Sequence, residues 1–265
     1  MFRRRQSPVF WLLLAASTAV AQRSDPQTGA FRMTDTLAGI AGEEVAARVA
    51  DVIRTDEPIT WEIYVPPHYD PADPPGLMVY ISPTRSGKIP NDWELVMDEY
   101  NLIWVAANQS GNLASVGRRT IIARVAPALV ARSYAVDPER VYVTGFSGGA
   151  RMASMVAIEH ADLFKGAIYN CGVNFWDKQT PRHIDLVRDN HYVFITGTYD
   201  GALKPTLRIH RKYLEAGVEN AKLMVIREMT HRNPNRYDFA EAVAYLDARI
   251  GQITERTDTQ DYPQR

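Results

Sequence analysis

One serine stands in a sequence pattern that makes it a candidate nucleophile. Ser147 is the middle residue of Gly-Phe-Ser-Gly-Gly at 145–149, after an apolar, strand-like run at 141–144 and before a helix-like run at 150–157. A G-x-S-x-G turn between a strand and a helix is strained, because side chains at the flanking glycine positions would collide with neighbouring backbone. Such a turn presents Oγ above the sheet. The pattern therefore predicts nucleophilic chemistry at Ser147.

A serine nucleophile needs a base, and two histidines lie late enough in the chain to serve. His210 falls within residues 203–214, whose apolar residues recur at roughly helical spacing, so we expect it on a surface or boundary helix. His231 follows the strand-like residues 221–229 and precedes Arg-Asn-Pro, a loop signal. A loop histidine at the carboxyl end of a strand can reach the serine. We predict His231 as the base; the alternative is a structural histidine.

The acid is chosen by the same reasoning. Of the aspartates between Ser147 and His231, only Asp200 ends a strong strand pattern, at residues 191–199. Gly201 follows it and a helix is expected near Pro205, which places Asp200 at the carboxyl end of the sheet. Its expected role is to accept the Nδ1 hydrogen of the histidine and stabilise the imidazolium. The alternatives are that Asp200 caps a helix or forms an Asx-turn, and that Asp177 is the acid.

Strands alternate with helices along most of the chain, which predicts an α/β fold with a mostly parallel central sheet and helices on both faces. Besides the segments above, the expected strands are 77–82, 102–107 and 166–171, and the expected helices are 92–100, 118–135 and 237–250. Nearer the start, residues 45–53 and 59–65 predict a hairpin at one sheet edge. The first arm could equally be a helix starting near Gly42.

Composition is typical of one globular domain. The chain has 265 residues, 46% hydrophobic and 23% charged, with a formal net charge of −1. Near neutrality gives no reason to expect a nucleic-acid partner or an acidic membrane surface. The single cysteine, Cys171, lies in an apolar run and is expected to be a buried strand residue.

The N-terminus carries the signature of a secretory signal peptide. Three arginines at 3–5 precede an apolar stretch at 9–21, and small residues before Ala21 suit cleavage there. The stretch is shorter than the roughly 20 residues that span a bilayer, and an uncleaved anchor is the alternative. We expect a signal peptide at 1–21, a flexible leader at 22–36, the domain at 37–253 and a polar tail at 254–265. The mature protein is then secreted or periplasmic.

Three segments resemble one branch of the α/β-hydrolases. They are Tyr-Val-Pro-Pro-His-Tyr-Asp-Pro at 64–71, Val-Asp-Pro-Glu-Arg before the serine strand at 136–140, and Asp-Leu-Phe-Lys-Gly-Ala at 162–167. Together with the serine turn, they are similar to secreted esterases and polyhydroxybutyrate-depolymerase-like proteins, a branch that includes feruloyl and acetylxylan esterases. The resemblance implies the α/β-hydrolase fold and a Ser-His-Asp esterase. The matching positions are Ser147, Asp200 and His231.

The chain departs from that branch in the loop that follows the third strand. Members usually carry His-Gly and small residues there, whereas this chain has Ser-Pro-Thr-Arg-Ser-Gly-Lys at 82–88. One oxyanion donor is the N–H after the nucleophile, here Gly148, and the second comes from that loop. Pro83 has no N–H, so Thr84 is expected as the second donor and Arg85 is next. Arg85 and Lys88 can also bring positive charge to the site, or be solvated loop charges.

Aromatic residues near the predicted site bear on the substrate. Four aromatic residues are candidates to line a substrate pocket, or else to fill the core: Trp93, Phe146, Trp176 and Tyr199. We expect a small-molecule or soluble oligomeric ester as substrate, with no metal or organic cofactor and no membrane span after signal cleavage. The predicted function is ester cleavage through an acyl-enzyme. The alternatives are a serine peptidase with the same triad and a catalytically impaired binding protein.

Overall fold

A computed structural model describes residues 26–177 and 179–247, and its centre is one eight-stranded sheet. The strand order is β1-β2-β4-β3-β5-β6-β7-β8, and the strands from β4 to β8 in that order pair in parallel. β1 and β2 pair antiparallel at one edge, and β2 pairs antiparallel with β4. The strands are β1 (Gly29–Thr36), β2 (Pro58–Val65), β3 (Gly76–Ile81), β4 (Leu102–Ala107), β5 (Val141–Phe146), β6 (Gly166–Asn170), β7 (His191–Gly197) and β8 (Ala221–Ile226).

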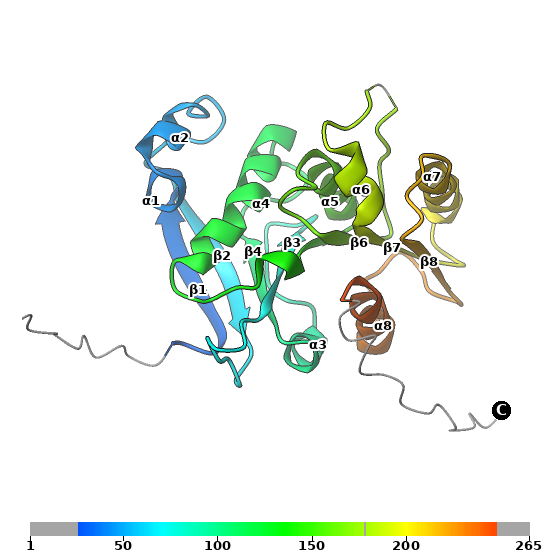
Figure 1. The fold of residues 1–265 in the computed structure, drawn as a ribbon, viewed down its shortest axis with the longest axis horizontal. Coiled ribbons are helices and arrows are strands. Elements are labelled where there is room, and N and C mark those ends of the chain that lie inside the picture. Colours follow the sequence, from blue (N-terminus) through cyan, green and yellow to red (C-terminus); the bar gives the residue numbers. More distant parts are fainter. Residues whose placement is uncertain (1–25, 178, 248–265) are drawn as a thin grey trace, which may run out of the picture.

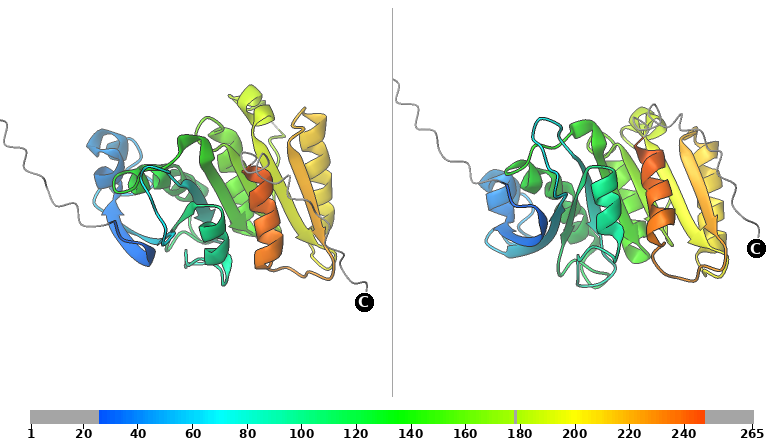
Figure 2. Two further views of the ribbon diagram at one scale, coloured as in Figure 1. Left: turned by 60° about the horizontal axis from the view of Figure 1, so that its bottom comes forward. Right: turned by 90° about the horizontal axis from the view of Figure 1, so that it is seen from below.

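Helices cover both faces of this sheet, as Figure 1 shows. The side with α4, α5 and α7 carries the larger core, and α3 and α8 cover the other face, where Figure 2 shows them side by side. The helices are α1 (Leu37–Ala41), α2 (Glu43–Ala47), α3 (Trp93–Glu99), α4 (Val116–Ala131), α5 (Gly148–Glu159), α6 (Ile184–Asp189), α7 (Leu203–Glu215) and α8 (Arg236–Leu246).

The central strands are buried on both faces, which explains their unbroken apolar sequences. All six residues of β3 are buried; Leu77, Val79 and Ile81 face one core, and Met78 and Tyr80 face the other. Such strands occur where helices cover both sides of a parallel sheet. The α/β fold class predicted from the sequence is confirmed.

The N-terminal edge differs from expectation. Residues 29–36, predicted as part of a flexible leader, form β1 and pair along its whole length with β2. The expected hairpin between residues 45–53 and 59–65 is wrong, and the alternative is correct, because a helix begins at Glu43 and β2 pairs with β1 instead. Side chains on β1 alternate between half-buried and exposed, which makes this edge strand look polar in the sequence. The expected signal peptide and polar tail lie outside the described residues.

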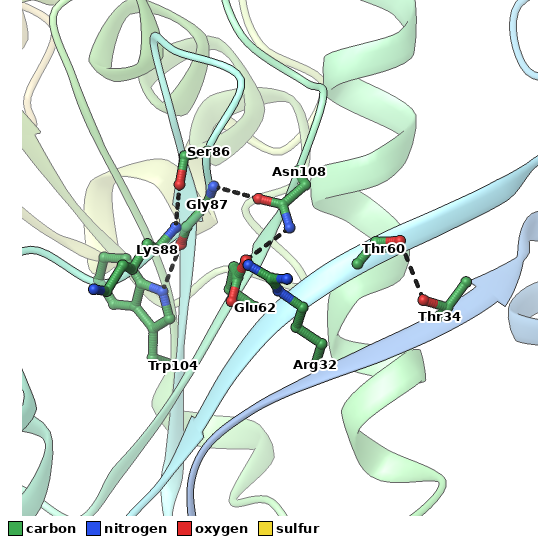
Figure 3. Close-up of polar contacts among 9 residues, drawn as sticks. All are labelled: Arg32, Thr34, Thr60, Glu62, Ser86, Gly87, Lys88, Trp104 and Asn108. Carbon is green, nitrogen blue, oxygen red and sulfur yellow. Dashed lines mark hydrogen bonds and ion pairs between the residues drawn. The ribbon is translucent and has the colours of Figure 1, made fainter.

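Polar contacts tie this edge to the loop after β3 (Figure 3). Arg32 on β1 donates to Glu62 on β2 over 2.8 Å, and Asn108 donates to the same carboxylate over 2.8 Å. The Asn108 side-chain oxygen accepts the Gly87 N–H at 2.8 Å, and Trp104 Nε1 donates to the Gly87 carbonyl. A Cβ at Gly87 would lie 2.6 Å from the Ala106 carbonyl oxygen, so glycine is needed for this close approach. Asn108 and Trp104 therefore hold the loop after β3 in place at Gly87.

Among the described residues, no helix is both long and apolar enough to cross a membrane.

Candidate active site

Ser147 occupies a strained turn between β5 and α5. Its φ is 54° and its ψ is −118°, and its N–H donates to the Asn170 carbonyl at 2.9 Å. A Cβ on Gly145 would lie 2.4 Å from the Gly149 carbonyl carbon, and a Cβ on Gly149 would lie 1.8 Å from the Ile81 carbonyl oxygen. Both flanking glycines are therefore required by close backbone contacts. This is the physical reason that the sequence pattern predicted.

The predicted base and acid converge on this serine. His231 Nε2 lies 2.9 Å from Ser147 Oγ, and His231 Nδ1 lies 2.8 Å from Asp200 Oδ1. The three residues follow β5, β7 and β8 in a parallel sheet, so the carboxyl ends of these strands meet at one edge. Ser147, His231 and Asp200 form one continuous hydrogen-bonded chain.

Asp200 is buried and held by several donors. Thr196 Oγ1 donates to Oδ2 at 3.1 Å, and the Ala202 N–H donates to Oδ1 at 2.9 Å, so an Asx-turn and the contact with His231 coexist. Burial raises the pKa of Asp200, but hydrogen bonds from Ala202, Cys171, His231 and Thr196 outweigh it and lower the pKa below its ordinary value. An ionised carboxylate only accepts, so a neutral His231 donates from Nδ1 and accepts at Nε2 from Ser147.

Two other candidates from the sequence lie apart from this chain of contacts. His210 is on α7, as expected for a helix residue, and its Nε2 lies 2.8 Å from the Ala221 carbonyl. Asp177, the alternative acid, forms an exposed ion pair with Lys212. Neither contacts Ser147 or His231 in the described hydrogen bonds.

Cys171 lies beneath the acid, a position that the sequence reading missed. It is 1% exposed, as predicted, but follows β6 with a φ of 56°. Its Sγ lies within 4.8 Å of ligand atoms of Asp200 and His231 and 3.3 Å from the Arg232 carbonyl oxygen. Burial, then the neighbouring Asp200, raises the pKa of this thiol. Because β6 lies between the strands of Ser147 and Asp200, the residue ending β6 was the available signal.

The same three groups offer the donor types that a soft metal ion binds. Cys171, Asp200 and His231 supply one sulfur, one oxygen and one nitrogen. Both ring nitrogens of His231 are already engaged, Nδ1 by Asp200 and Nε2 by Ser147. A metal ion would have to displace one of these hydrogen bonds, so the arrangement fits proton transfer better than metal binding.

On the other side of Ser147 lie the loops after β3 and β4. The Gly148 N–H opens the 12-residue helix α5, so no carbonyl within the helix accepts it, and the helix dipole favours negative charge there. The Thr84 N–H, predicted as the second oxyanion donor, instead donates to Ser82 Oγ at 3.1 Å. Ser82 and Thr84 form a local turn, which proline at position 83 favours. The prediction for Thr84 is therefore not supported by the geometry.

The four aromatic pocket candidates lie in four different places. The Phe146 ring lies 4.9 Å from the His231 ring, beside the reacting groups. Trp93 is wrong as a pocket residue, because it is 1% exposed and stacks on Phe239 in the core; its Nε1 donates to the Pro234 carbonyl and so supports the loop after His231. Tyr199 is exposed on the surface next to Asp200.

Trp176 belongs to a different cavity. This groove of about 920 Å³ runs along α5 and is lined by Met155, His160 and Trp176 among others. A smaller cleft, of about 340 Å³, adjoins the serine turn and is lined by Thr84, Arg85, Gln109, Asn112, Leu113 and Arg118 among others. Asn112 connects this cleft to the site, because a Cβ on Gly148 would lie 2.2 Å from its Oδ1. The cleft is the better candidate for substrate binding.

Comparisons with known proteins fit this geometry. The model of the prolyl oligopeptidase family matches residues 121–192. Over 96 residues the chain is 29% identical to a poly(3-hydroxybutyrate) depolymerase of Ralstonia pickettii, an alignment covering 31% of this chain. The alignment covers 20% of that relative, so the chain matches about a fifth of its length.

Solved structures give a similarity in fold. A ferulic acid esterase superposes with a TM-score of 0.60 at 14% identity, over 82% of this chain and 98% of that one. A feruloyl esterase module from Clostridium thermocellum superposes with a TM-score of 0.57 at 14% identity, over 89% of this chain and 92% of that one. These matches fit the esterase and depolymerase-like branch that the sequence motifs indicate.

Proposed function

We propose that this chain, a member of the α/β-hydrolase superfamily, is a serine hydrolase that cleaves carboxylic esters through an acyl-enzyme. The observation that carries the proposal is the continuous chain from Ser147 Oγ through His231 to Asp200, with separations of 2.9 and 2.8 Å. These distances are within reach for proton transfer. Esterases among the structural neighbours support the choice of an ester bond.

In acylation, His231 Nε2 takes the proton of Ser147 as Oγ forms a bond to the ester carbonyl carbon. The carbonyl electron pair moves onto oxygen, and the Gly148 N–H donates to this oxyanion. Asp200 stabilises the imidazolium. Collapse of the tetrahedral intermediate breaks the bond to the alcohol oxygen, which takes the proton from His231 and leaves.

In deacylation, a water molecule replaces the alcohol. His231 has an exposed side chain, at 48% of its full area, so water can reach Nε2 once the alcohol has left. His231 then accepts a proton from this water as the water oxygen bonds to the acyl carbon. The tetrahedral intermediate collapses with breakage of the bond to Ser147 Oγ, which takes the proton back from His231, and the carboxylic acid and free enzyme are released. These steps require no metal or organic cofactor.

The cleft beside Gly148 suggests the class of substrate. At about 340 Å³ it suits one small group of an ester, and Leu113 and Arg85 offer it apolar and cationic contacts. A small or soluble oligomeric ester fits this cleft. We further propose that the protein is exported through a signal peptide at residues 1–21, so the mature chain is secreted or periplasmic. Sequencing the N-terminus of the exported protein tests this, with Gln22 expected first.

Labelling with a fluorophosphonate tests the catalytic proposal. The mature protein should be labelled and should hydrolyse short-chain p-nitrophenyl esters. Ser147→Ala should lose labelling and about 10⁶-fold in kcat, because the nucleophile is gone. Ser133→Ala, at an exposed position, is the matched control and should behave as wild type. Folded wild-type protein that neither labels nor turns over would overturn the esterase proposal and favour a binding role.

A serine peptidase is the alternative, and the match to the prolyl oligopeptidase family favours it. The same triad would attack an amide and release an amine. Matched ester and anilide substrates with one acyl group discriminate the two. We expect kcat/KM for the ester to exceed that for the anilide well beyond their difference in chemical reactivity; equal or reversed preference would favour the peptidase.

A further inference from the structure

The side chain of Asn112 lies against the residue that follows the nucleophile. A Cβ built on Gly148 would lie 2.2 Å from Asn112 Oδ1, 2.7 Å from Cγ and 2.8 Å from Nδ2. The carboxamide therefore occupies the space that a side chain at position 148 would take. It sits beside the first N–H of α5, where an oxyanion is expected to bind.

The loop that carries Asn112 is held firmly against the loop after β3. The Asn112 N–H donates to the Pro83 carbonyl at 2.9 Å. A Cβ on Gly111 would lie 2.4 Å from the Thr84 carbonyl oxygen, so the two loops touch along their backbones. Asn112 thus has a fixed backbone position between Gly148 and the substrate cleft.

A buried arginine holds the loop after β3 and the loop after β4 together. Arg119, on α4, is 5% exposed; its Nε donates to the Ser110 carbonyl at 3.1 Å, and its Nη2 donates to the Ser82 carbonyl at 3.0 Å. Desolvation lowers the pKa of this guanidinium. Because one planar group binds both carbonyls, the spacing between the loops is set by a rigid side chain.

The Asn112 carboxamide itself is not committed elsewhere. Among residues 26–177 and 179–247, no hydrogen bond to its side chain is found, and the residue is exposed. Its NH₂ group offers two donors, and rotation about the terminal bond can turn either end toward Gly148. In contrast, the Thr84 N–H is engaged by Ser82, and Pro83 has none to offer.

We propose that the Asn112 side chain is the second oxyanion donor, acting with the Gly148 N–H. This inference rests on the proposed esterase function. When Ser147 Oγ bonds to the acyl carbon, the carbonyl electron pair moves to oxygen, and Nδ2–H of Asn112 donates to the resulting anion. A side-chain amide is a suitable donor for this purpose in serine hydrolases. The site would then use a side chain from the next loop in place of the Thr84 N–H.

Substitution at Asn112 tests the proposal. Asn112→Ala should lower kcat by about 10²- to 10³-fold with little change in KM, because the lost interaction forms only in the transition state. Asn112→Asp keeps the shape but places an acceptor at the oxyanion, and should fall at least as far. Asn220→Ala is the matched control: this asparagine precedes β8, at the end of the strand opposite the triad, and donates from Nδ2 only to the Asp189 carbonyl among the described hydrogen bonds, so its kcat should stay within about threefold of wild type.

A second readout separates a donor from a purely structural residue. A trifluoromethyl ketone forms a tetrahedral adduct that bears an oxyanion, whereas a product carboxylic acid does not. In Asn112→Ala, the inhibition constant of the ketone should rise by a factor close to the loss in kcat/KM. The inhibition constant of the acid and the melting temperature should stay unchanged.

Three results would decide against the inference. They are kcat in Asn112→Ala equal to that in Asn220→Ala, equal loss of inhibition by the ketone and by the acid, and full activity in Asn112→Asp. Each presupposes an active wild type, so they differ from a failure of the proposed function, in which the wild type itself would neither label nor hydrolyse esters.

Discussion

The two sides of Ser147 are built in different ways. On the acid–base side, the carboxylate of Asp200 receives donors from Thr196, Ala202 and His231, which lie in β7 or in the loops that follow β7 and β8. On the oxyanion side, two loops meet, one expected backbone donor is used internally, and a buried arginine sets their spacing. The acid–base side is complete without substrate, whereas the oxyanion side leaves the Asn112 side chain available for it.

Strong hydrogen bonding in the free protein and readiness for the transition state are therefore separate properties of the site. The acid–base groups must hold one geometry through the whole cycle. Oxyanion donors must instead be free of partners within the protein, so that they can donate to the oxygen on which charge develops. Substitutions on the two sides of Ser147 should therefore impair the protein in different ways.

The largest effect is expected from Asp200→Asn. The amide keeps the shape but can donate to His231 and favour the wrong tautomer, so kcat should fall by about 10⁴-fold. The matched control is Asp177→Asn, which removes the other candidate acid from its surface ion pair and should leave kcat unchanged. Initial rates on a p-nitrophenyl ester measure both. A large loss in Asp177→Asn with a small one in Asp200→Asn would reverse the assignment.

A comparison of the wild type with Asp200→Asn also gives a prediction about pH. Because the folded pKa of Asp200 is lowered, its carboxylate stabilises the fold above the unfolded value, about 3.9, and this contribution is lost as the pH falls through the folded pKa. The free energy of unfolding, measured with denaturant, should therefore fall in acid more steeply for the wild type than for Asp200→Asn. Parallel curves would show that the hydrogen bonds to Asp200 add no net stability.

A smaller effect is expected from Arg119→Met on the oxyanion side. The change leaves the buried carbonyls of Ser82 and Ser110 without their shared donor, which costs about 1–3 kcal/mol for each. The free energy of unfolding should fall, and kcat should drop by up to about 10²-fold as Asn112 loses its position. Arg118→Met is the control for stability. The ion pair of Arg118 with Glu57 is partly exposed, so its removal should lower the free energy of unfolding by less than about 1 kcal/mol. Wild-type values in Arg119→Met would show that the loops hold their spacing without it.

The comparison also explains what could be predicted from the sequence. Strand ends are visible as the point where an apolar run stops, so Ser147, Asp200 and His231 could be found by order and position. The edge strand β1 was missed because alternate side chains on it are polar or exposed. Trp93 was misassigned, because an aromatic residue at the start of a helix looks the same whether it faces a cleft or, as here, the core.

The oxyanion side was harder because its chemistry depends on contacts between loops that are distant in the chain. The sequence showed that Pro83 lacks an N–H, but it could not show that Ser82 Oγ takes the Thr84 N–H. Asn112 carried no local signal either, since it becomes relevant only where its loop packs on Gly148. Backbone donors have no residue type, and a side chain that replaces one is recognisable only in three dimensions.

The smallest effect is expected at Cys171, which tests how closed the acid–base side is. Burial and the neighbouring Asp200 raise the pKa of this thiol, so it should stay protonated and react with a disulfide reagent at pH 8 far more slowly in the native protein than in urea. Cys171→Ser keeps a donor near Asp200 and should retain kcat within about threefold, with a loss of stability near 1 kcal/mol. A native thiol that reacts as fast as the unfolded one would mean that solvent reaches the space beneath Asp200. The acid–base side would then be as open as the oxyanion side, and the contrast between the two sides of Ser147 would lie only in the identity of their donors.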